Sequence, residues 1–468
     1  MVTRLSASDA SFFRLENSST PMYVGTLQIV RKPRNGLSYE TLLHTVEQRL
    51  PQIPRYRQKV REVRFGLARP VWVDDRDFDI TYHIRRSALP SPGSDAQLHE
   101  LIARLAARPL DKSRPLWEMY LVEGLAKNRL AIYTKSHQAL VNGMTALEIC
   151  HVIADRTQKP PQFGEDIWIP AREPSDNQLL LGAVGEWITR PTAQAAALRS
   201  AVTETVTNTG ELLDLGRRVA DVARTVARGT APSSPLNATV SRNRRFSVAS
   251  ADLDHFRLVK TRYDCDINDV VLAVVAGALR NWLLSRAEPV TATSRVRAMA
   301  PMSVYAEDLD SSAGQAVNDV APFLVDLPVG EANPVVRLSQ IAHATESHPT
   351  ASSLVDARSI VTLSGFAPPT LHAMGIRVAT SFSARLFNLL ITNAPGAQKQ
   401  MYIAGTKLLE TYAVPPLLHN QALAIGVTSY NGMLYFGINA DRDAMSDVEM
   451  VPSLMQEALD ELVDAARS

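Results

Sequence analysis

The stretch from Tyr133 to Met144 contains the residues of this 468-residue chain best suited to chemistry. It begins within a strand-like apolar run, Leu130 to Thr134, and continues through His137, Gln138 and Gly143. Histidine can accept a proton near neutral pH, because its ordinary pKa is about 6.5. The amide of Gln138 does not titrate near pH 7, but it can hydrogen-bond to a hydroxyl or to a developing oxyanion. Because clefts between layers commonly form at strand ends, we expect a site here.

The direction of the His137 side chain decides what it can do. If residues 136 to 138 are extended, neighbouring side chains point to opposite faces, and His137 faces away from Gln138. If the chain has already turned at His137, the imidazole can swing toward the same side. The sequence leaves both geometries open, so His137 is either a proton acceptor or a structural histidine.

Several common kinds of site are not expected. The chain has no GxGxxG, GxxxxGK[ST], HExxH or GxSxG motif, which argues against dinucleotide-binding, P-loop and α/β-hydrolase sites. His343 and His348 have no third ligand suggested near them, so we expect no metal. The two cysteines, Cys150 and Cys265, lack CxxC or Cys/His spacing. We therefore expect neither a disulfide framework nor a zinc site, as in a reducing cytoplasm.

The composition is that of an ordinary globular protein. Hydrophobic residues make up 46% and charged residues 21%, and the formal net charge is +1, which argues against polyanion binding. The basic clusters 31–34 and 242–245 are short and lack interleaved aromatic residues, so we expect no nucleic-acid partner. The first thirty residues lack a sustained apolar stretch, so we expect no secretory signal.

The order of segments predicts an α/β protein with two halves. We assign residues 1–167 to an N-terminal half, 168–240 to a helical crossover rich in Ala, Thr and Pro, and 241–468 to a C-terminal half. The longest apolar run, Val270 to Leu279, is about half of what a spanning helix requires. We expect a buried core helix there, and only peripheral contact with a membrane.

Periodicity predicts the local elements. Apolar spacing near 3.6 predicts helices around 38–50, 98–105, 268–284 and 451–462, while 69–73 and 78–80 are expected to be extended. In the crossover, apolar positions from Leu212 to Val226 predict an amphipathic helix. Residues 422–430 and 433–438 predict a hairpin across Asn431-Gly432. Asn268 is expected to cap the helix that follows it.

Several blocks resemble those of the bacterial wax ester synthase and diacylglycerol acyltransferase family, especially the mycobacterial triacylglycerol synthases. That family carries His-His-x-x-x-Asp-Gly where this chain has His137, Gln138, Asn142 and Gly143. The further matching blocks extend over nearly the whole chain, and they are Pro21 to Gly25, Phe78-Asp79 with His83, Leu89-Pro90 with Pro92-Gly93, Arg114 to Glu118, Asn268 to Val270, Thr392 to Gly396, and Ser429-Tyr430 with Asp441.

The resemblance implies a fold, a reaction and a set of site residues. It implies two chloramphenicol-acetyltransferase-like halves that enclose a channel at their interface. In the family the second His takes the alcohol proton while the oxygen attacks an acyl-CoA thioester, without an acyl-enzyme. By register, the catalytic residues are then His137, Gln138 and Asn142. The residues expected to bind substrate are Gly143, Asn393, Pro395 and Gly396.

Two departures from the family motif bear on activity. Gln138 replaces the base, and Asn142 replaces an Asp that is thought to hold the loop, a role that a neutral amide can partly keep. The expected function is transfer of a fatty acyl group from acyl-CoA to diacylglycerol, with weak turnover. The alternatives are a silent relative that binds acyl-CoA or neutral lipid, and a wax ester synthase that uses a long-chain alcohol. Acyl-CoA is expected as co-substrate without a further cofactor, in a cytoplasmic protein peripheral to membrane or lipid droplets.

Overall fold

The computed structural model describes most of both halves of the chain. The described residues are 3–6, 9–10, 12–13, 16–32, 37–64, 68–141, 148–159, 161, 164, 167–181, 231–301, 322–346, 386–394 and 396–468. Three predicted site residues, Asn142, Gly143 and Pro395, lie outside them. The predicted amphipathic helix from Leu212 to Val226 also lies outside the described residues.

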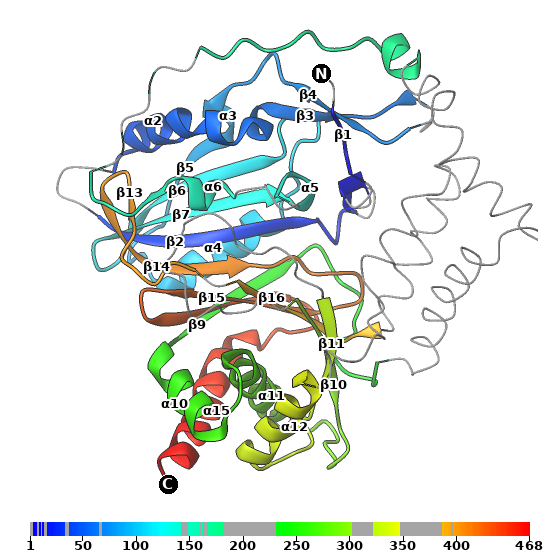
Figure 1. Ribbon diagram of the computed structural model, residues 1–468, viewed down its shortest axis with the longest axis vertical. Helices are drawn as coiled ribbons and strands as arrows, with labels where there is room; N and C mark the ends of the chain where they lie inside the picture. The colour runs from blue at the N-terminus through cyan, green and yellow to red at the C-terminus, as the bar shows by residue number, and fades with distance from the viewer. Residues whose placement is uncertain are drawn as a thin grey trace, which may run out of the picture.

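The first large sheet has seven strands, and its centre leads to His137 (Figure 1). Its strands pair antiparallel except for the parallel pair β5 and β6. Tyr23 pairs with His137 at the end of the β2–β7 ladder. In spatial order the strands are β5 (Ile84–Ala88), β6 (Trp117–Leu125), β7 (Arg129–His137), β2 (Tyr23–Arg31), β14 (Thr406–Val414), β13 (Tyr402–Ile403) and β8 (Ala154–Asp155).

The second large sheet has six strands and lies beside the first (Figure 1). Its order is β11 (Pro322–Leu327), β10 (Val296–Pro301), β12 (Leu389–Ala394), β15 (Leu423–Tyr430), β16 (Met433–Asp441) and β9 (Arg244–Asp252). A small third sheet has the order β1 (Thr3–Arg4), β4 (Val71–Asp74) and β3 (Gln58–Arg61). The mixture of sheets and covering helices confirms the predicted α/β class.

Helices cover the outer faces of the two large sheets (Figure 1). On the first sheet these are α2 (Tyr39–Arg49) and α3 (Ile80–His83), whereas α4 (Asp95–Ala107) contacts β9 of the second sheet. Below the second sheet lie α10 (Leu253–Tyr263), α11 (Ile267–Ser285), α12 (Pro334–Glu346) and α15 (Val451–Arg467). Short helices in the described chain include α5 (Gln138–Val141), α6 (Ile149–Val152), η1 (Leu50–Gln52), η2 (Pro54–Arg57) and η4 (Val448–Met450).

Local chemistry explains most of the predicted elements. Ser94 and Gln97 cap α4 reciprocally: the Ser94 N–H donates to Gln97 Oε1 at 2.7 Å, and the Gln97 N–H donates to Ser94 Oγ at 3.3 Å. The predicted hairpin is confirmed, with positive φ values of 48° at Asn431 and 82° at Gly432. The extended prediction for 78–80 is wrong at its end. The Asp79 carboxylate accepts the Thr81 N–H and starts α3 at residue 80.

The predicted core helix is confirmed as α11. Residues 268 to 279 are buried without interruption. Among the described helices it is the one whose length and composition would suffice to cross a membrane, and 78% of its apolar window is buried inside the protein. Core helices of soluble proteins share these properties, so the helix is weak evidence for a membrane span.

Strand β14 joins the two halves of the chain. It belongs to the predicted C-terminal half, yet it pairs with β2 of the first sheet, from Gly25–Val414 to Val30–Leu408. Sheet membership therefore does not follow the predicted division at 241, and the boundaries at 167 and 240 stay predictions.

The strand β14 lies against two glycines of the second sheet. Gly426 and Gly437 are paired across β15 and β16. A Cβ on Gly437 would lie 1.7 Å from the carbonyl oxygen of Ala413, and one on Gly426 would lie 2.7 Å from the Ala413 Cβ. The two glycines thus form a notch that admits the β14 backbone.

We predict that Gly437→Ala destabilises the fold by about 1 to 3 kcal/mol, because the added methyl group would force β14 off the second sheet. The measurement is equilibrium unfolding in urea. Gly164→Ala is the control, because a Cβ there meets no described atom within 4 Å. Equal unfolding midpoints for the two variants would contradict the close approach at the notch.

Candidate functional site

Three backbone groups hold the end of β7 where the predicted motif begins. The His137 N–H donates to the carbonyl of Leu116 at 3.0 Å, and the Gln138 N–H donates to the carbonyl of Met22 at 2.9 Å. The Ala139 N–H then turns back and donates to His137 Nδ1 at 3.0 Å. The chain is therefore extended up to His137 and turns into α5 directly after it.

The imidazole of His137 lies inside the protein. Its exposed fraction is 0%, and the rings of Phe13 and Tyr23 lie 5.8 and 5.9 Å away, centroid to centroid. Because Nδ1 accepts a hydrogen bond, the neutral ring carries its proton on Nε2, which lies 3.7 Å from Glu16 Oε2. This geometry favours the structural alternative for His137, and the predicted proton-accepting role stays untested.

Gln138 differs from His137 in its surroundings. The residue is partly exposed, whereas its amide oxygen Oε1 is buried and has no hydrogen-bond partner in the described part of the chain. A buried acceptor without a donor is costly, by about 1–3 kcal/mol, and native structures rarely leave one. The amide can therefore receive a hydroxyl donor from a bound molecule.

The carboxylate beside His137 stays ionised. Burial by itself raises the pKa of Glu16, but the neighbouring side chains of His137, Lys112 and Tyr23 outweigh burial and hold that pKa at about 2. Lys112 Nζ lies 2.6 Å from Glu16 Oε2 and 4.4 Å from the centroid of the Phe13 ring. Neither Glu16 nor Lys112 was predicted as a site residue, since no motif links them to position 137.

A second buried ion pair lies close to the motif in sequence. Lys135 is fully buried and its Nζ lies 3.2 Å from Glu118 Oε2. Its ammonium also donates to the carbonyls of Leu105 and Arg108, at 3.1 and 2.8 Å, where α4 ends. Burial lowers the pKa of Lys135. Lys135 therefore ties the end of α4 to the first sheet.

The predicted substrate-binding residues of the second half lie at the ends of β12 and β15. The Gly396 N–H donates to Ser429 Oγ at 3.1 Å, and a Cβ on Gly396 would lie 2.1 Å from the carbonyl oxygen of Ser429. Asn393 Nδ2 donates to Asn268 Oδ1. Only glycine fits at 396, and Asn393 joins the strand end to α11.

The predicted capping role of Asn268 is wrong. The N-cap of α11 is Asp266, whose N–H donates to Asp269 Oδ2 at 2.9 Å in a capping box. Because Asp266 takes that role, the buried Asn268 is left to accept from Asn393.

The block from Arg114 to Glu118 contributes buried residues that pack beside the site. Trp117 is fully buried, and its Nε1 donates to the carbonyl of Tyr56 at 2.8 Å, so it is a core residue. The His83 ring stacks on Trp117 at 4.6 Å and 12°. Asp441 is likewise buried, and it accepts from the Ser241 N–H and hydroxyl, both at 2.7 Å. These residues act in packing.

One group of potential metal ligands occurs among the described residues. Oxygen, sulfur and nitrogen atoms of Glu148, Cys150 and His151 lie within 4.8 Å of one another. Burial raises the pKa of Cys150 well above its ordinary value, and its thiol donates to Glu148 Oε2 at 3.2 Å. A protonated thiol is a poor metal ligand, so this group resembles a local hydrogen-bond cluster.

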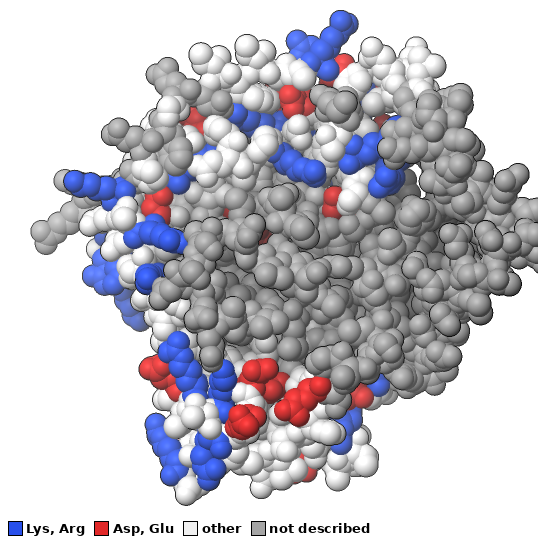
Figure 2. Space-filling view, in the orientation of Figure 1, with Lys and Arg blue, Asp and Glu red and all other residues white. Residues whose placement is uncertain are grey.

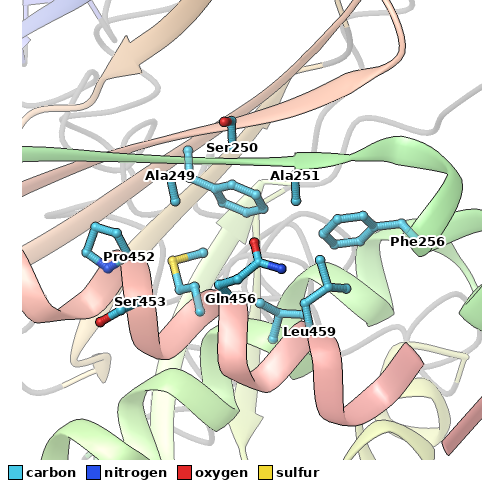
Figure 3. Close-up of a pocket in the computed structure, with 11 residues that line it drawn as sticks. Ala249, Ser250, Ala251, Phe256, Pro452, Ser453, Gln456 and Leu459 are labelled. Atoms are coloured by element: carbon cyan, nitrogen blue, oxygen red, sulfur yellow. The ribbon is translucent and has the colours of Figure 1, made fainter. Parts of the chain in front are cut away.

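A cavity of about 250 Å³ lies away from the strand end (Figure 3). It opens between the edge strand β9 and α15, and its apolar walls include Ala249, Ala251, Phe256 and Leu459. None of its lining residues comes from β7 or from the motif. The channel expected between the halves stays a prediction.

Comparison with known proteins identifies the family. A model of the wax ester synthase/diacylglycerol acyltransferase catalytic domain matches residues 5–271, and a model of the C-terminal domain matches residues 317–463. The chain belongs to the wax ester synthase/diacylglycerol acyltransferase family. The resemblance inferred from the motif blocks is thereby confirmed.

Relatives of this family member include two mycobacterial proteins. A probable diacylglycerol O-acyltransferase of Mycobacterium tuberculosis is 76% identical over 266 residues, which are 57% of this chain and 98% of that protein. A second protein of that name from the same organism is 30% identical over 467 residues, which are 99% of this chain and 96% of that protein.

Solved structures confirm the fold. The wax ester synthase/diacylglycerol acyltransferase from Marinobacter aquaeolei VT8 is 25% identical with a TM-score of 0.71, and the match covers 100% of both chains. The first condensation domain of a calcium-dependent antibiotic synthetase is 15% identical with a TM-score of 0.56, over 100% of this chain and 96% of that one. The second likeness concerns the fold alone.

We predict that His83 makes folding sensitive to mild acid. Burial lowers its pKa to about 4, although the hydrogen bond to the Trp117 carbonyl opposes this. In the unfolded chain His83 takes up a proton below about pH 6.5, whereas in the folded protein it does so only near pH 4. The free energy of unfolding is therefore unaffected by His83 above pH 6.5, and it falls by roughly 3 kcal/mol between pH 6.5 and pH 4. Urea unfolding between pH 7 and 4 measures this loss.

His83→Gln should make the pH dependence shallower, whereas the control His44→Gln, at an exposed histidine, should leave it unchanged. An identical pH dependence in native protein and His83→Gln would exclude His83 as the source.

Proposed function

We propose that this protein transfers a fatty acyl group from acyl-CoA to the hydroxyl of a diacylglycerol. Membership in the family is the observation that carries the proposal, and the M. tuberculosis relatives carry the corresponding name. In the balanced reaction the alcohol oxygen bonds to the thioester carbonyl carbon and the carbon–sulfur bond breaks. The hydroxyl proton ends on the CoA sulfur.

Gln138 contributes a hydrogen bond in place of a base. Its buried Oε1 meets no donor among the described residues, and the hydroxyl of the acceptor lipid supplies one. The hydrogen bond orients the oxygen toward the thioester, but the amide does not take the proton at neutral pH. Loss of a general base costs about 10² to 10⁴ in rate, so turnover is slow.

We predict that Gln138→His raises kcat for triacylglycerol formation by about 10² to 10⁴, because an imidazole restores the base. The assay uses purified protein with radiolabelled acyl-CoA and diacylglycerol, with a long-chain alcohol as the alternative acceptor. Gln138→Met is the matched control, since it keeps the length of the side chain and removes its hydrogen bond.

The controls separate three outcomes. Equal rates for native protein and Gln138→His would mean that position 138 is not the place of proton transfer. A native rate that disappears in His137→Ala, with the fold intact, would assign that step to His137. If neither protein forms product but both bind acyl-CoA, the chain is a silent lipid-binding relative, which the two amides at 138 and 142 also favour.

We further propose that the protein is cytoplasmic and meets its lipid substrate at a membrane or droplet surface. Ile167 and Ile169 are the most exposed large hydrophobic residues recorded in the described chain, at 84% and 80%. Between them, Trp168 packs under the Arg57 guanidinium, 5.1 Å from its ring centroid. Figure 2 shows both basic and acidic side chains on the described part of one face. We therefore base the proposed contact with lipid on the two exposed isoleucines and not on charge.

Replacing both isoleucines by serine, Ile167→Ser with Ile169→Ser, should weaken binding to phosphatidylcholine vesicles containing diacylglycerol by about tenfold. Co-sedimentation measures the effect. Val336→Ser is the control, because Val336 is 43% exposed on α12. Unchanged binding in the double variant would place the contact elsewhere.

A further inference from the structure

We propose that Glu16 is a positioning residue for the reaction. Its carboxylate holds the imidazole of His137, and that imidazole holds the backbone from which Gln138 reaches the substrate hydroxyl. The inference rests on the proposed function, because it concerns the same strand end. It adds a residue that no motif of the sequence indicates.

The contacts of Glu16 converge on the buried ring. Glu16 Oε2 lies 3.7 Å from His137 Nε2 and 2.6 Å from Lys112 Nζ. The side chain of Glu16 is 5% exposed and that of His137 is 0% exposed. Lys112 is 43% exposed, so the ammonium reaches the carboxylate from the solvent side. Because both atoms of the Glu16–His137 contact are shielded from water, their attraction is weakly screened.

The negative charge of Glu16 suits the tautomer of His137 that faces it. The Glu16 carboxyl, with a pKa of about 2, is negative throughout the neutral range. His137 directs Nε2 at this carboxylate, and Nε2 carries the proton because Nδ1 accepts the Ala139 N–H. His137 Nε2 has no hydrogen-bond partner in the described part of the chain, and the negative carboxylate of Glu16 faces its N–H at 3.7 Å.

The ring orientation is transmitted to Gln138 through the backbone. Gln138 lies between the His137 ring and the Ala139 N–H that the ring accepts, at 3.0 Å. A flip of the ring would place the Cδ2–H group against that N–H and would remove the hydrogen bond that closes the turn. A displacement of about 1 Å at the reacting hydroxyl can cost about 10²-fold in rate.

The residues that follow Glu16 are themselves held in place. Asn17 Oδ1 accepts from the N–H groups of Ser19 and Thr20, both at 2.9 Å, which closes a tight turn. From the second half of the chain, Arg242 donates to Ser18 Oγ at 3.1 Å. The neighbouring Arg244 donates to the carbonyl of Ser19. The position of the carboxylate therefore depends on the docking of the two halves.

The test replaces the carboxylate by an amide of the same shape. In the Gln138→His protein, Glu16→Gln should lower kcat by about tenfold to a hundredfold, with KM changed less than twofold. Glu16→Asp keeps the charge and should recover part of kcat. A purely structural defect would instead lower the amount of folded protein, and Glu16→Asp would not restore kcat.

A buried ion pair elsewhere in the same half supplies the matched control. Arg49 Nη2 and Asp155 Oδ1 are 2.8 Å apart, and both side chains are almost fully buried. Asp155→Asn removes a buried charge at comparable risk to folding, but it touches neither His137 nor the 16–20 loop. It should leave kcat within twofold. An equal loss of kcat in Glu16→Gln and Asp155→Asn would overturn the proposal.

A spectroscopic arm separates this proposal from the proposed function. In ¹⁵N-histidine-labelled protein, the His137 signals, assigned by loss in His137→Gln, should show the Nε2–H tautomer. In Glu16→Gln a second tautomer should appear. If neither the native protein nor Gln138→His forms product, the proposed function fails and this spectrum decides the role of Glu16 alone. An unchanged single tautomer in Glu16→Gln would overturn it.

Discussion

The crossing of β14 over the second sheet is the contact on which the rest of the architecture depends. Ala413 lies over the paired glycines Gly426 and Gly437, where any side chain would overlap its carbonyl or its methyl group. The same strand pairs with β2. Since β2 also pairs with β7, whose last residue is His137, one backbone crossing sets the second half against the strand that carries the motif.

The strand end combines a sealed imidazole with a nearby unsatisfied amide. His137 is enclosed by aromatic rings and a carboxylate, while Oε1 of Gln138 is buried without a donor from any residue that the structure describes. A protein gains nothing in stability from such an acceptor, because it loses the hydrogen bond that water would make. The cost is understandable if a substrate hydroxyl completes the bond. Under the proposed function, the chemistry left to this site is orientation of the reactants, with proton transfer weakened by the missing base.

Local patterns predicted the elements that depend on neighbours in sequence. The Asn431-Gly432 hairpin and the helix around 268–284 were predictable because turn chemistry and apolar periodicity act over a few residues. The cap of α11 was not, since Asp266 competes with Asn268 for the same role. Pairing of β14 with β2 was also missed. Strand pairing across the length of the chain leaves no short-range pattern.

The sequence by itself determined the family and the limit on the chemistry. Motif blocks spread over the chain identify the family, and an amide at 138 cannot titrate wherever it points. Only the tertiary structure decided that the His137 ring is buried and that Glu16 faces it. The physical reason is that the direction of a side chain and its charged partner depend on packing between segments far apart in the chain. Whether the side chain can take up a proton near neutral pH depends first on its own covalent structure.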